Sequence, residues 1–229
     1  MTHSSNREFV WQQDSDQINA LIEKIDQNLL PFVEILSLDP HDPVIVTRVP
    51  HPWKVLGAGN YAAVFVHPNY PDQVVKIYAP NRPGFDEERE VYHRLGSHSS
   101  FSECFYAQNN VLVLKRLYGM TLYDCLHYGK RIPKSVIGDI DRALDYARSR
   151  GLSPHDVHAR NVMMDGVNGL VVDVSDFLHS DPCAKWKHFK RAYYWFYLPI
   201  VAPLGLQVPH LWLDTIRRSY RRLKRLIGE

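Results

Sequence analysis

SPHDVHARNVMMDGVNGLVVD, the stretch Ser153–Asp173, decides the fold predicted for this chain. It holds an aspartate, Asp156, and an asparagine five residues later, Asn161. Two short apolar runs follow, VMM and LVV, and a turn that contains glycine separates them, so they predict two strands joined as a hairpin. Such a hairpin would bring Asn161 and Asp173, at its two open ends, side by side.

These residue types fit one kind of chemistry. Phosphoryl transfer from a nucleotide needs a carboxylate that positions the attacking hydroxyl, and an asparagine and a second aspartate that hold Mg²⁺ on the phosphates. Asp156, Asn161 and Asp173 could divide these tasks. An aspartate in an Asx-turn and a capping asparagine would give the same pattern without any catalytic role. The stretch alone therefore leaves both interpretations open.

The stretch resembles the catalytic loop and the metal-binding aspartate of the protein-kinase-like superfamily. By this resemblance Asp156 stands at the catalytic aspartate, Asn161 at the metal-binding asparagine and Asp173 at the aspartate of the DFG motif. The resemblance implies that Asp156 aligns the acceptor hydroxyl and that Asn161 and Asp173 coordinate Mg²⁺.

The stretch also departs from the protein-kinase pattern. Pro154-His155 replaces the usual His-Arg, and Val174-Ser175 replaces Phe-Gly. His158 stands at the place of the catalytic-loop lysine. A histidine at this position makes the loop more similar to that of aminoglycoside and choline kinases. The resemblance implies that His158 stabilises charge near the γ-phosphate.

Upstream, residues 53–66 read WKVLGAGNYAAVFV, where two apolar runs flank a turn of small residues and predict a hairpin. Glycines in this turn let backbone N–H groups approach phosphate oxygens. The pattern resembles the glycine-rich loop of kinases, with Ala62 at the third glycine and Val64 at the valine that covers adenine. An ordinary hairpin turn is the alternative, and no strand–helix pattern follows that would favour a dinucleotide site. The resemblance implies nucleotide contacts by Gly57, Ala58, Gly59, Asn60 and Val64.

A lysine then interrupts a β-branched strand, QVVKIY at residues 73–78. Lysine is common on edge strands for structural reasons, but the run resembles the V-A-I-K strand of kinases. The resemblance implies that Lys76 contacts the α- and β-phosphates and pairs with an acidic residue of the helix predicted at Phe85–Leu95. Glu88 is the favoured partner and Glu90 is the alternative. The acidic residues could also be only the solvated start of a helix, which the helix dipole favours, and would then need no partner.

Further signals place the remaining elements. A strand is predicted at Asn110–Leu114 and an amphipathic helix at Pro133–Arg150. A helix cap is predicted at Thr121. By the resemblance, Leu114 is the gatekeeper residue beside the adenine. The backbone groups of two residues, Lys115 and Leu117, would then face the edge of the adenine.

The two ends of the chain carry weaker signals. Asp14 or Ser15 could cap a helix with apolar residues at helical spacing, which predicts a helical extension packed on the core. Near the other end, a last helix over residues 213–227 would carry the basic residues of Arg217–Arg225. A solvated basic face is the favoured interpretation of these residues, and contact with a membrane surface or an acidic partner is the alternative.

Composition limits the class of protein. The 229 residues have a formal net charge of only +2, so no strong attraction to nucleic acid is expected. Three cysteines without CxxC spacing suggest neither a disulfide framework nor a zinc site. The sequence does not open with a basic segment followed by an apolar one, so we do not expect a secretory signal. We therefore expect a cytoplasmic location.

These motifs follow one another in the order that kinases have, and together they predict the fold and the activity. The expected fold is α+β and bilobal, with an antiparallel β N-lobe at about 44–117, an abbreviated helical C-lobe at about 118–229 and an N-terminal helical extension at 1–43. The expected activity is ATP- and Mg²⁺-dependent transfer of phosphate to a hydroxyl, most simply a Ser or Thr of a protein substrate. A small-molecule kinase of the aminoglycoside or choline type and a nucleotide-binding pseudokinase are the alternatives. The residues expected to be catalytic are Lys76, Glu88, Asp156 and His158.

Overall fold

The computed structural model describes residues 15–39, 42–181 and 183–211. The chain divides into two units, Met1–Leu117 and Tyr118–Glu229, called here the N-terminal and the C-terminal unit. Each unit combines helices with sheets, and the strand pairings among the described residues are antiparallel. The α+β class with antiparallel sheets that the sequence predicts is therefore confirmed.

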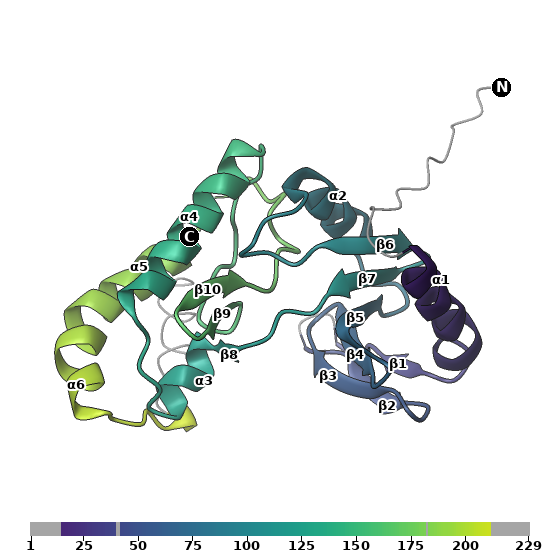
Figure 1. The fold of residues 1–229 in the computed structure, drawn as a ribbon, viewed down its shortest axis with the longest axis horizontal. Coiled ribbons are helices and arrows are strands. Elements are labelled where there is room, and N and C mark those ends of the chain that lie inside the picture. Colours follow the sequence, from purple (N-terminus) through teal and green to yellow (C-terminus); the bar gives the residue numbers. More distant parts are fainter. Residues whose placement is uncertain (1–14, 40–41, 182, 212–229) are drawn as a thin grey trace. The chain divides into compact units, whose positions relative to one another are not determined.

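A five-stranded sheet forms the centre of the N-terminal unit (Figure 1). Its strands follow the order β3-β4-β5-β7-β6, so β5 lies in the middle and is paired on both sides. Three antiparallel pairs, β3 with β4, β4 with β5 and β6 with β7, join strands that follow one another in the sequence, so short turns can connect them. The strands are β3 (Lys54–Ala58), β4 (Ala62–His67), β5 (Tyr70–Tyr78), β6 (Cys104–Gln108) and β7 (Val111–Lys115).

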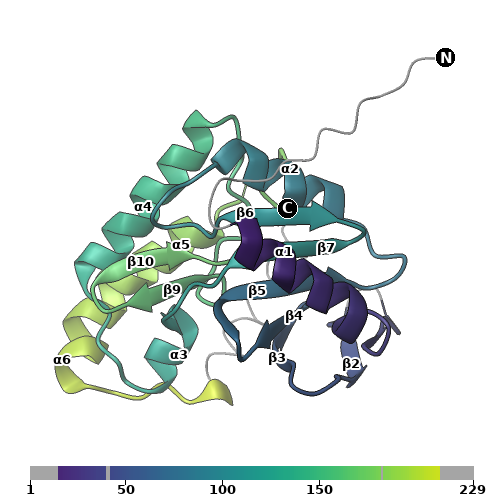
Figure 2. The same ribbon diagram turned by 45° about the vertical axis from the view of Figure 1, so that its right-hand side comes forward.

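The first helix packs its apolar face on this sheet (Figure 2). Helix α1 (Ser15–Lys24) continues without a break into a π-helical turn, η1 (Ile25–Leu29). Their buried residues join one cluster with β4, β5 and β7. The helix that the sequence predicts as an extension thus contributes to the core of the N-terminal unit. The helical members of the cluster are Ile18, Leu21, Ile25 and Leu29.

A second helix, α2 (Phe85–Leu95), covers the opposite face of the sheet. Val75 and Ile77 belong to the cluster that contains α1, whereas Lys76 and Tyr78 both bond to Glu88 of α2. Successive side chains of a strand point to opposite faces. Alternate side chains of β5 therefore point to two different faces of the sheet. The apolar ones pack under α1, and the polar ones contact α2.

The C-terminal unit combines a small three-stranded sheet with helices. The sheet has the order β10-β9-β8, and the hairpin of its two longer strands is the one that the sequence predicts. Thr121 caps the first helix as expected, because its Oγ1 accepts a hydrogen bond from the Asp124 N–H at 3.0 Å. The elements are β8 (Met120–Thr121), α3 (Leu122–His127), α4 (Lys134–Ser149), β9 (Val162–Asp165), β10 (Asn168–Val171), α5 (Lys185–Ala192), η2 (Tyr193–Val201) and α6 (Ala202–Leu204).

Helix α4 fixes the hairpin through a close backbone contact. A Cβ at Gly169 would lie 2.4 Å from the Val136 carbonyl oxygen, and real Cβ contacts are essentially never that short. The Gly169 N–H also donates to Asp139 Oδ2 of α4 at 3.0 Å. Glycine at this position is therefore required by packing.

Several details differ from the sequence-based expectations. The short strand β1 (Glu34–Leu36), which no sequence signal predicts, pairs with β2 (Ile45–Arg48). Strand β6 has no counterpart among the predictions. The proposed cap Asp14 and the helix expected at 213–227, with Arg217–Arg225, lie outside the described residues. Among the helices that the structure describes, none has the length and apolarity needed to cross a bilayer.

Candidate functional site

A buried ion pair joins strand β5 to helix α2. Lys76 Nζ lies 2.9 Å from Glu88 Oε1 and 2.6 Å from Oε2. The Glu88 side chain is only 1% exposed and that of Lys76 15%. The Tyr78 hydroxyl also donates to Glu88. Burial raises the pKa of the neighbouring Cys104 thiol to about 12, and the Glu88 charge adds to the rise, which marks this environment as poorly solvated.

The surroundings of the pair distinguish between the sequence-based alternatives. Strand β5 is central, so Lys76 is not an edge-strand lysine. Glu90, the alternative partner, accepts instead from Arg94 Nε at 2.7 Å. The acidic residue that pairs with Lys76 is therefore Glu88.

Three predicted nucleotide-contacting residues form a row across the sheet. Gly57 of β3 is the register partner of Val64 in β4, and Val64 is the register partner of Lys76 in β5. Residues in register on neighbouring strands share one face of a sheet. The row therefore lies on the face of the sheet that carries the ion pair.

The glycine turn between β3 and β4 is held by backbone bonds. The Gly59 N–H donates to the Ala62 carbonyl at 2.9 Å, and the Gly59 carbonyl accepts from the Val44 N–H at 2.9 Å. Ala58 and Asn60 are exposed in the same turn. A Cβ at Gly57 would meet no atom within 4 Å, so packing does not require glycine there.

The segment predicted to face adenine lies at the end of the N-terminal unit. Leu114 is buried in β7. The Lys115 carbonyl, one of the predicted adenine contacts, accepts from Ser102 Oγ at 2.7 Å, and its N–H donates to the Glu103 carbonyl at 2.8 Å. Leu117 follows as a half-buried residue.

In the C-terminal unit, Asp156 has an unusual backbone and two basic neighbours. Its φ is +52°, in the left-handed region that few residues other than Gly, Asn and Asp adopt. Its Oδ2 lies 3.6 Å from His158 Nε2. Its Oδ1 forms an ion pair with Lys185, the first residue of α5.

The hairpin β9–β10 brings the three polar residues of the central stretch together. The Val172 N–H donates to the Asn161 carbonyl at 3.0 Å and closes the open end of the hairpin next to Asp173. Asn161 Nδ2 donates to the Asp156 carbonyl at 3.1 Å. Asp173 Oδ1 accepts from the Ser175 N–H at 3.2 Å.

Asn161 and Asp173 offer the oxygen ligands that suit Mg²⁺. This ion is usually held by one or two protein oxygens together with water and the phosphates of a substrate. A cage of three His, Cys, Asp or Glu residues does not occur in the part of the chain that the structure describes. The oxygens of Asn161 and Asp173 could serve as the two protein ligands of such an ion.

Lys185 is the residue that the sequence analysis misses. It follows Asp173 by one loop and begins α5, whose sequence KWKHFKRA indicates a basic helix. Nothing in that pattern relates Lys185 to Asp156, because the contact depends on how the chain folds back after Asp173. The ammonium and the carboxylate come together only in the folded chain.

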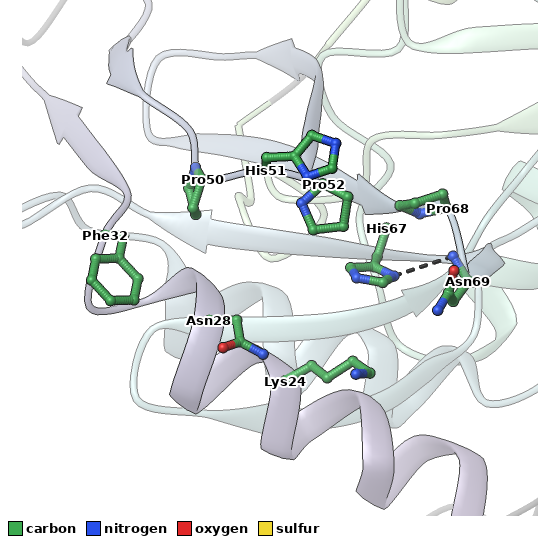
Figure 3. Close-up of a pocket in the computed structure, with 9 residues that line it drawn as sticks. All are labelled: Lys24, Asn28, Phe32, Pro50, His51, Pro52, His67, Pro68 and Asn69. Atoms are coloured by element: carbon green, nitrogen blue, oxygen red, sulfur yellow. Dashed lines mark hydrogen bonds between the residues drawn. The ribbon is translucent and has the colours of Figure 1, made fainter.

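A separate pocket of about 470 Å³ opens in the N-terminal unit (Figure 3). The His67 ring accepts the Asn69 N–H on Nδ1 at 3.2 Å, and burial and the Lys24 charge lower the pKa of this histidine. None of the predicted site residues lines this pocket. The lining residues are Lys24, Asn28, Phe32, Pro50, His51, Pro52, His67, Pro68 and Asn69.

Comparison with known proteins finds a similar bacterial protein. The chain is 26% identical over 171 residues to a Bacillus subtilis protein named "Putative serine/threonine-protein kinase YrzF". The chain is similar to a protein named as a kinase. The match covers 73% of this chain and 79% of the relative, and it agrees with the kinase-like resemblance of the motifs. No family model matches the chain.

Proposed function

We propose that this protein transfers the γ-phosphoryl group of ATP, with Mg²⁺, to a hydroxyl group, and that the acceptor is a Ser or Thr of a protein. The observation that carries the proposal is the buried pair of Lys76 and Glu88, in a row with Gly57 and Val64. The name of the bacterial relative supports the same class of reaction and acceptor.

The ion pair is difficult to explain by stability alone. Taking two charges out of water costs several kcal/mol per ion, and well-packed apolar residues at such sites are often equally or more stabilising. Glu88 is nevertheless almost completely buried against Lys76. A lysine whose ammonium must be held in one place to receive phosphate oxygens accounts for this arrangement.

The exposed glycine in the same row supports this interpretation. Gly57 has an ordinary backbone conformation and no neighbour where a side chain would lie. Glycine inside a strand costs about 0.5–1 kcal/mol relative to alanine. Close approach of a ligand to the backbone of β3 gives a reason for keeping it.

Residues of the C-terminal unit would perform the transfer. The acceptor oxygen bonds to the γ-phosphorus while the bond to the leaving ADP oxygen breaks, and Asp156 aligns the hydroxyl and takes its proton. Asn161 and Asp173 would hold Mg²⁺, which neutralises charge on the phosphates when bound. His158 lies beside Asp156 and would stabilise charge near the γ-phosphate.

Lys185 would serve as a positioning residue in this scheme. His158 stands where protein kinases have their loop lysine, and Lys185 supplies an ammonium to the same carboxylate from another element. A fixed ion pair limits the orientations of the Asp156 carboxylate. Positioning of this kind is a large part of catalysis in phosphoryl transfer.

A small-molecule kinase is the second candidate, because His158 beside Asp156 is more similar to the aminoglycoside and choline kinases. The two candidates differ only in the acceptor. Incubation with γ-labelled ATP and Mg²⁺, with and without a generic protein substrate, separates them. Label on protein supports the first candidate, and ATP turnover that only a small amine-bearing alcohol stimulates supports the second.

Variants link the measured activity to the site. Asp156→Asn should abolish transfer and retain ATP binding, whereas Asp173→Asn should also weaken binding of ATP with Mg²⁺. Asp145→Asn is the matched control, because Asp145 is an exposed aspartate that pairs with Arg148 of the same helix, α4. ATP binding without turnover by the unmodified protein would indicate a pseudokinase and overturn the proposal, as would full activity of both site variants.

A further inference from the structure

Buried aromatic side chains hold helices α5 and η2 against the rest of the C-terminal unit. The Tyr193 hydroxyl donates to the Ile132 carbonyl at 2.9 Å, and the Ile132 N–H donates to the Tyr197 hydroxyl at 2.8 Å. Both tyrosines are buried, as is Trp186 of α5. Trp186, Tyr193 and Tyr197 are seven and four residues apart, which places them on one helical side and marks it as the inward side of the two helices.

The outward side of η2 is strongly apolar and exposed. Trp195 is 71% exposed and Phe196 63% exposed, and Ile200 and Leu204 continue the surface at a spacing of four residues. A helix that is apolar on all sides is normally buried in a protein core or in a membrane. An exposed apolar surface of this kind usually marks a contact with a protein or a membrane.

Basic residues of α5 continue the exposed side of η2 towards the N-terminus. Lys187 and Arg191 of α5 are exposed and lead, at four-residue spacing, to Trp195. The other two cations of α5 are already paired, Lys185 with Asp156 and Lys190 with Asp141. The exposed stripe is defined as Lys187, Arg191, Trp195, Phe196, Ile200 and Leu204.

The charge of the chain is unevenly distributed along the sequence. Residues 183–211 contain no Asp or Glu. Residues 183–229 hold ten of the 27 Lys and Arg residues and only two of the 25 acidic ones. The rest of the chain is therefore net acidic, although the whole chain is nearly neutral. Such an asymmetry is typical of chains that bind an anionic surface.

We propose that the exposed stripe docks this protein on an anionic lipid bilayer. Trp and Phe would enter the boundary between headgroups and acyl chains, while Lys187 and Arg191 face the lipid phosphates. A second copy of the chain is disfavoured as the occupant, because it would bring the same positive charge against itself. The proposal does not depend on the phosphotransferase activity.

Flotation with lipid vesicles tests the apolar part. The full chain is mixed with vesicles of phosphatidylcholine alone or with phosphatidylglycerol as a minor component, and the expected result is binding to the second kind. Trp195→Ala/Phe196→Ala should reduce that binding by about tenfold or more, because the anchoring aromatic area is removed. Ile200→Ser tests the same side independently, and Leu38→Ala, at a residue 78% exposed in the N-terminal unit, is the control.

Charge reversal tests the basic part. Lys187→Glu/Arg191→Glu should reduce binding more than Lys54→Glu/Lys134→Glu, which changes the net charge equally at exposed residues outside the stripe. Binding should also weaken when the salt concentration rises, because salt screens exposed charges. Equal effects of the two double variants would contradict a role for this stripe.

Three other results would overturn the proposal. The first is that the protein fails to float with vesicles that contain phosphatidylglycerol. The second is concentration-dependent self-association without lipid that Trp195→Ala/Phe196→Ala abolishes, which would assign the stripe to a second copy. The third is tighter binding to polyglutamate than to anionic vesicles, which would assign it to an acidic protein.

Discussion

Gly57 and Gly169 show two different reasons for a glycine. At Gly169 the backbone of α4 leaves no room for a side chain, since a Cβ would lie 2.4 Å from the Val136 carbonyl oxygen. At Gly57 the same test finds empty space, and φ is not in the left-handed region. Packing therefore explains why position 169 is glycine. It does not explain Gly57, for which the close approach of the proposed nucleotide gives the reason.

Gly57→Ala should separate stability from binding. Alanine fits the space, so the free energy of unfolding should rise by about 0.4–1 kcal/mol, because the unfolded chain loses freedom. Affinity for ATP should fall by about tenfold, since the added methyl group keeps the phosphates from the backbone. Chemical denaturation and nucleotide titration measure the two effects. Unchanged affinity in the stabilised variant would remove Gly57 from the site.

Lys185→Met should lower the kcat of phosphoryl transfer by about a hundredfold and change the KM for ATP little. The methionine retains most of the length of the side chain but removes the ion pair between Lys185 and the Asp156 carboxylate. Lys185→Arg retains the charge and should restore much of the rate. Steady-state kinetics with varied ATP separate the two constants.

Lys190→Met is the matched control for this prediction. Lys190 lies on the same helix and pairs with Asp141 at 2.8 Å, so its loss removes a comparable partly exposed ion pair. Such pairs contribute about 0–1 kcal/mol to stability. A similar loss of rate in both variants would indicate that Lys185 acts through the stability of α5 and not through Asp156.

At the scale of elements, α1 and η1 belong to the folded core of the N-terminal unit. Leu21 is 1% exposed in the cluster that includes strands β4, β5 and β7. Leu21→Ala should therefore lower the free energy of unfolding by about 2–5 kcal/mol. Leu38→Ala should change it by less than about 0.5 kcal/mol, because that side chain is exposed. Equal stability of the two variants in urea unfolding would show that α1 is dispensable for the core.

The local elements were predictable because their signals lie within short segments. The hairpin β9–β10, the helix α4 and the Thr121 cap all follow from spacing and turn residues. Strand β6 was missed, because its sequence CFYAQ lacks clear alternation and it pairs with β7 only across a loop. Strand β1 was missed for a similar reason, since three residues after a helix carry little periodicity.

Part of the candidate site was also accessible from sequence. The pairing of Lys76 with Glu88 could be anticipated from a strand lysine and a following acidic helix, but the choice between Glu88 and Glu90 needed coordinates. The contact of Lys185 with Asp156 could not be anticipated, because it depends on tertiary folding and on no local pattern.

For the molecule as a whole, ATP with Mg²⁺ should raise the temperature of unfolding. A ligand at a hundred times its Kd stabilises the folded state by about 2.7 kcal/mol, which corresponds to roughly 5–10 °C for a chain of this size. Removal of Mg²⁺ with EDTA should cancel most of the increase. Differential scanning fluorimetry measures it.

Two variants test whether the proposed site residues produce that stabilisation. Asp173→Asn should lose the part that depends on Mg²⁺, whereas Lys76→Met should bind ATP more weakly with or without the metal. Asp145→Asn should respond to the nucleotide as the unmodified protein does. A full temperature increase in both site variants would mean that ATP binds elsewhere.

The left-handed backbone of Asp156 has a consequence for natural sequence drift. The position makes two demands, a residue that tolerates a φ of +52° and a carboxylate that can pair with Lys185. Aspartate meets both, while asparagine and glycine meet only the first. Descendants of this gene that lose their chemistry should therefore accumulate asparagine or glycine here, and seldom a β-branched residue, so decayed copies could be recognised from this single codon.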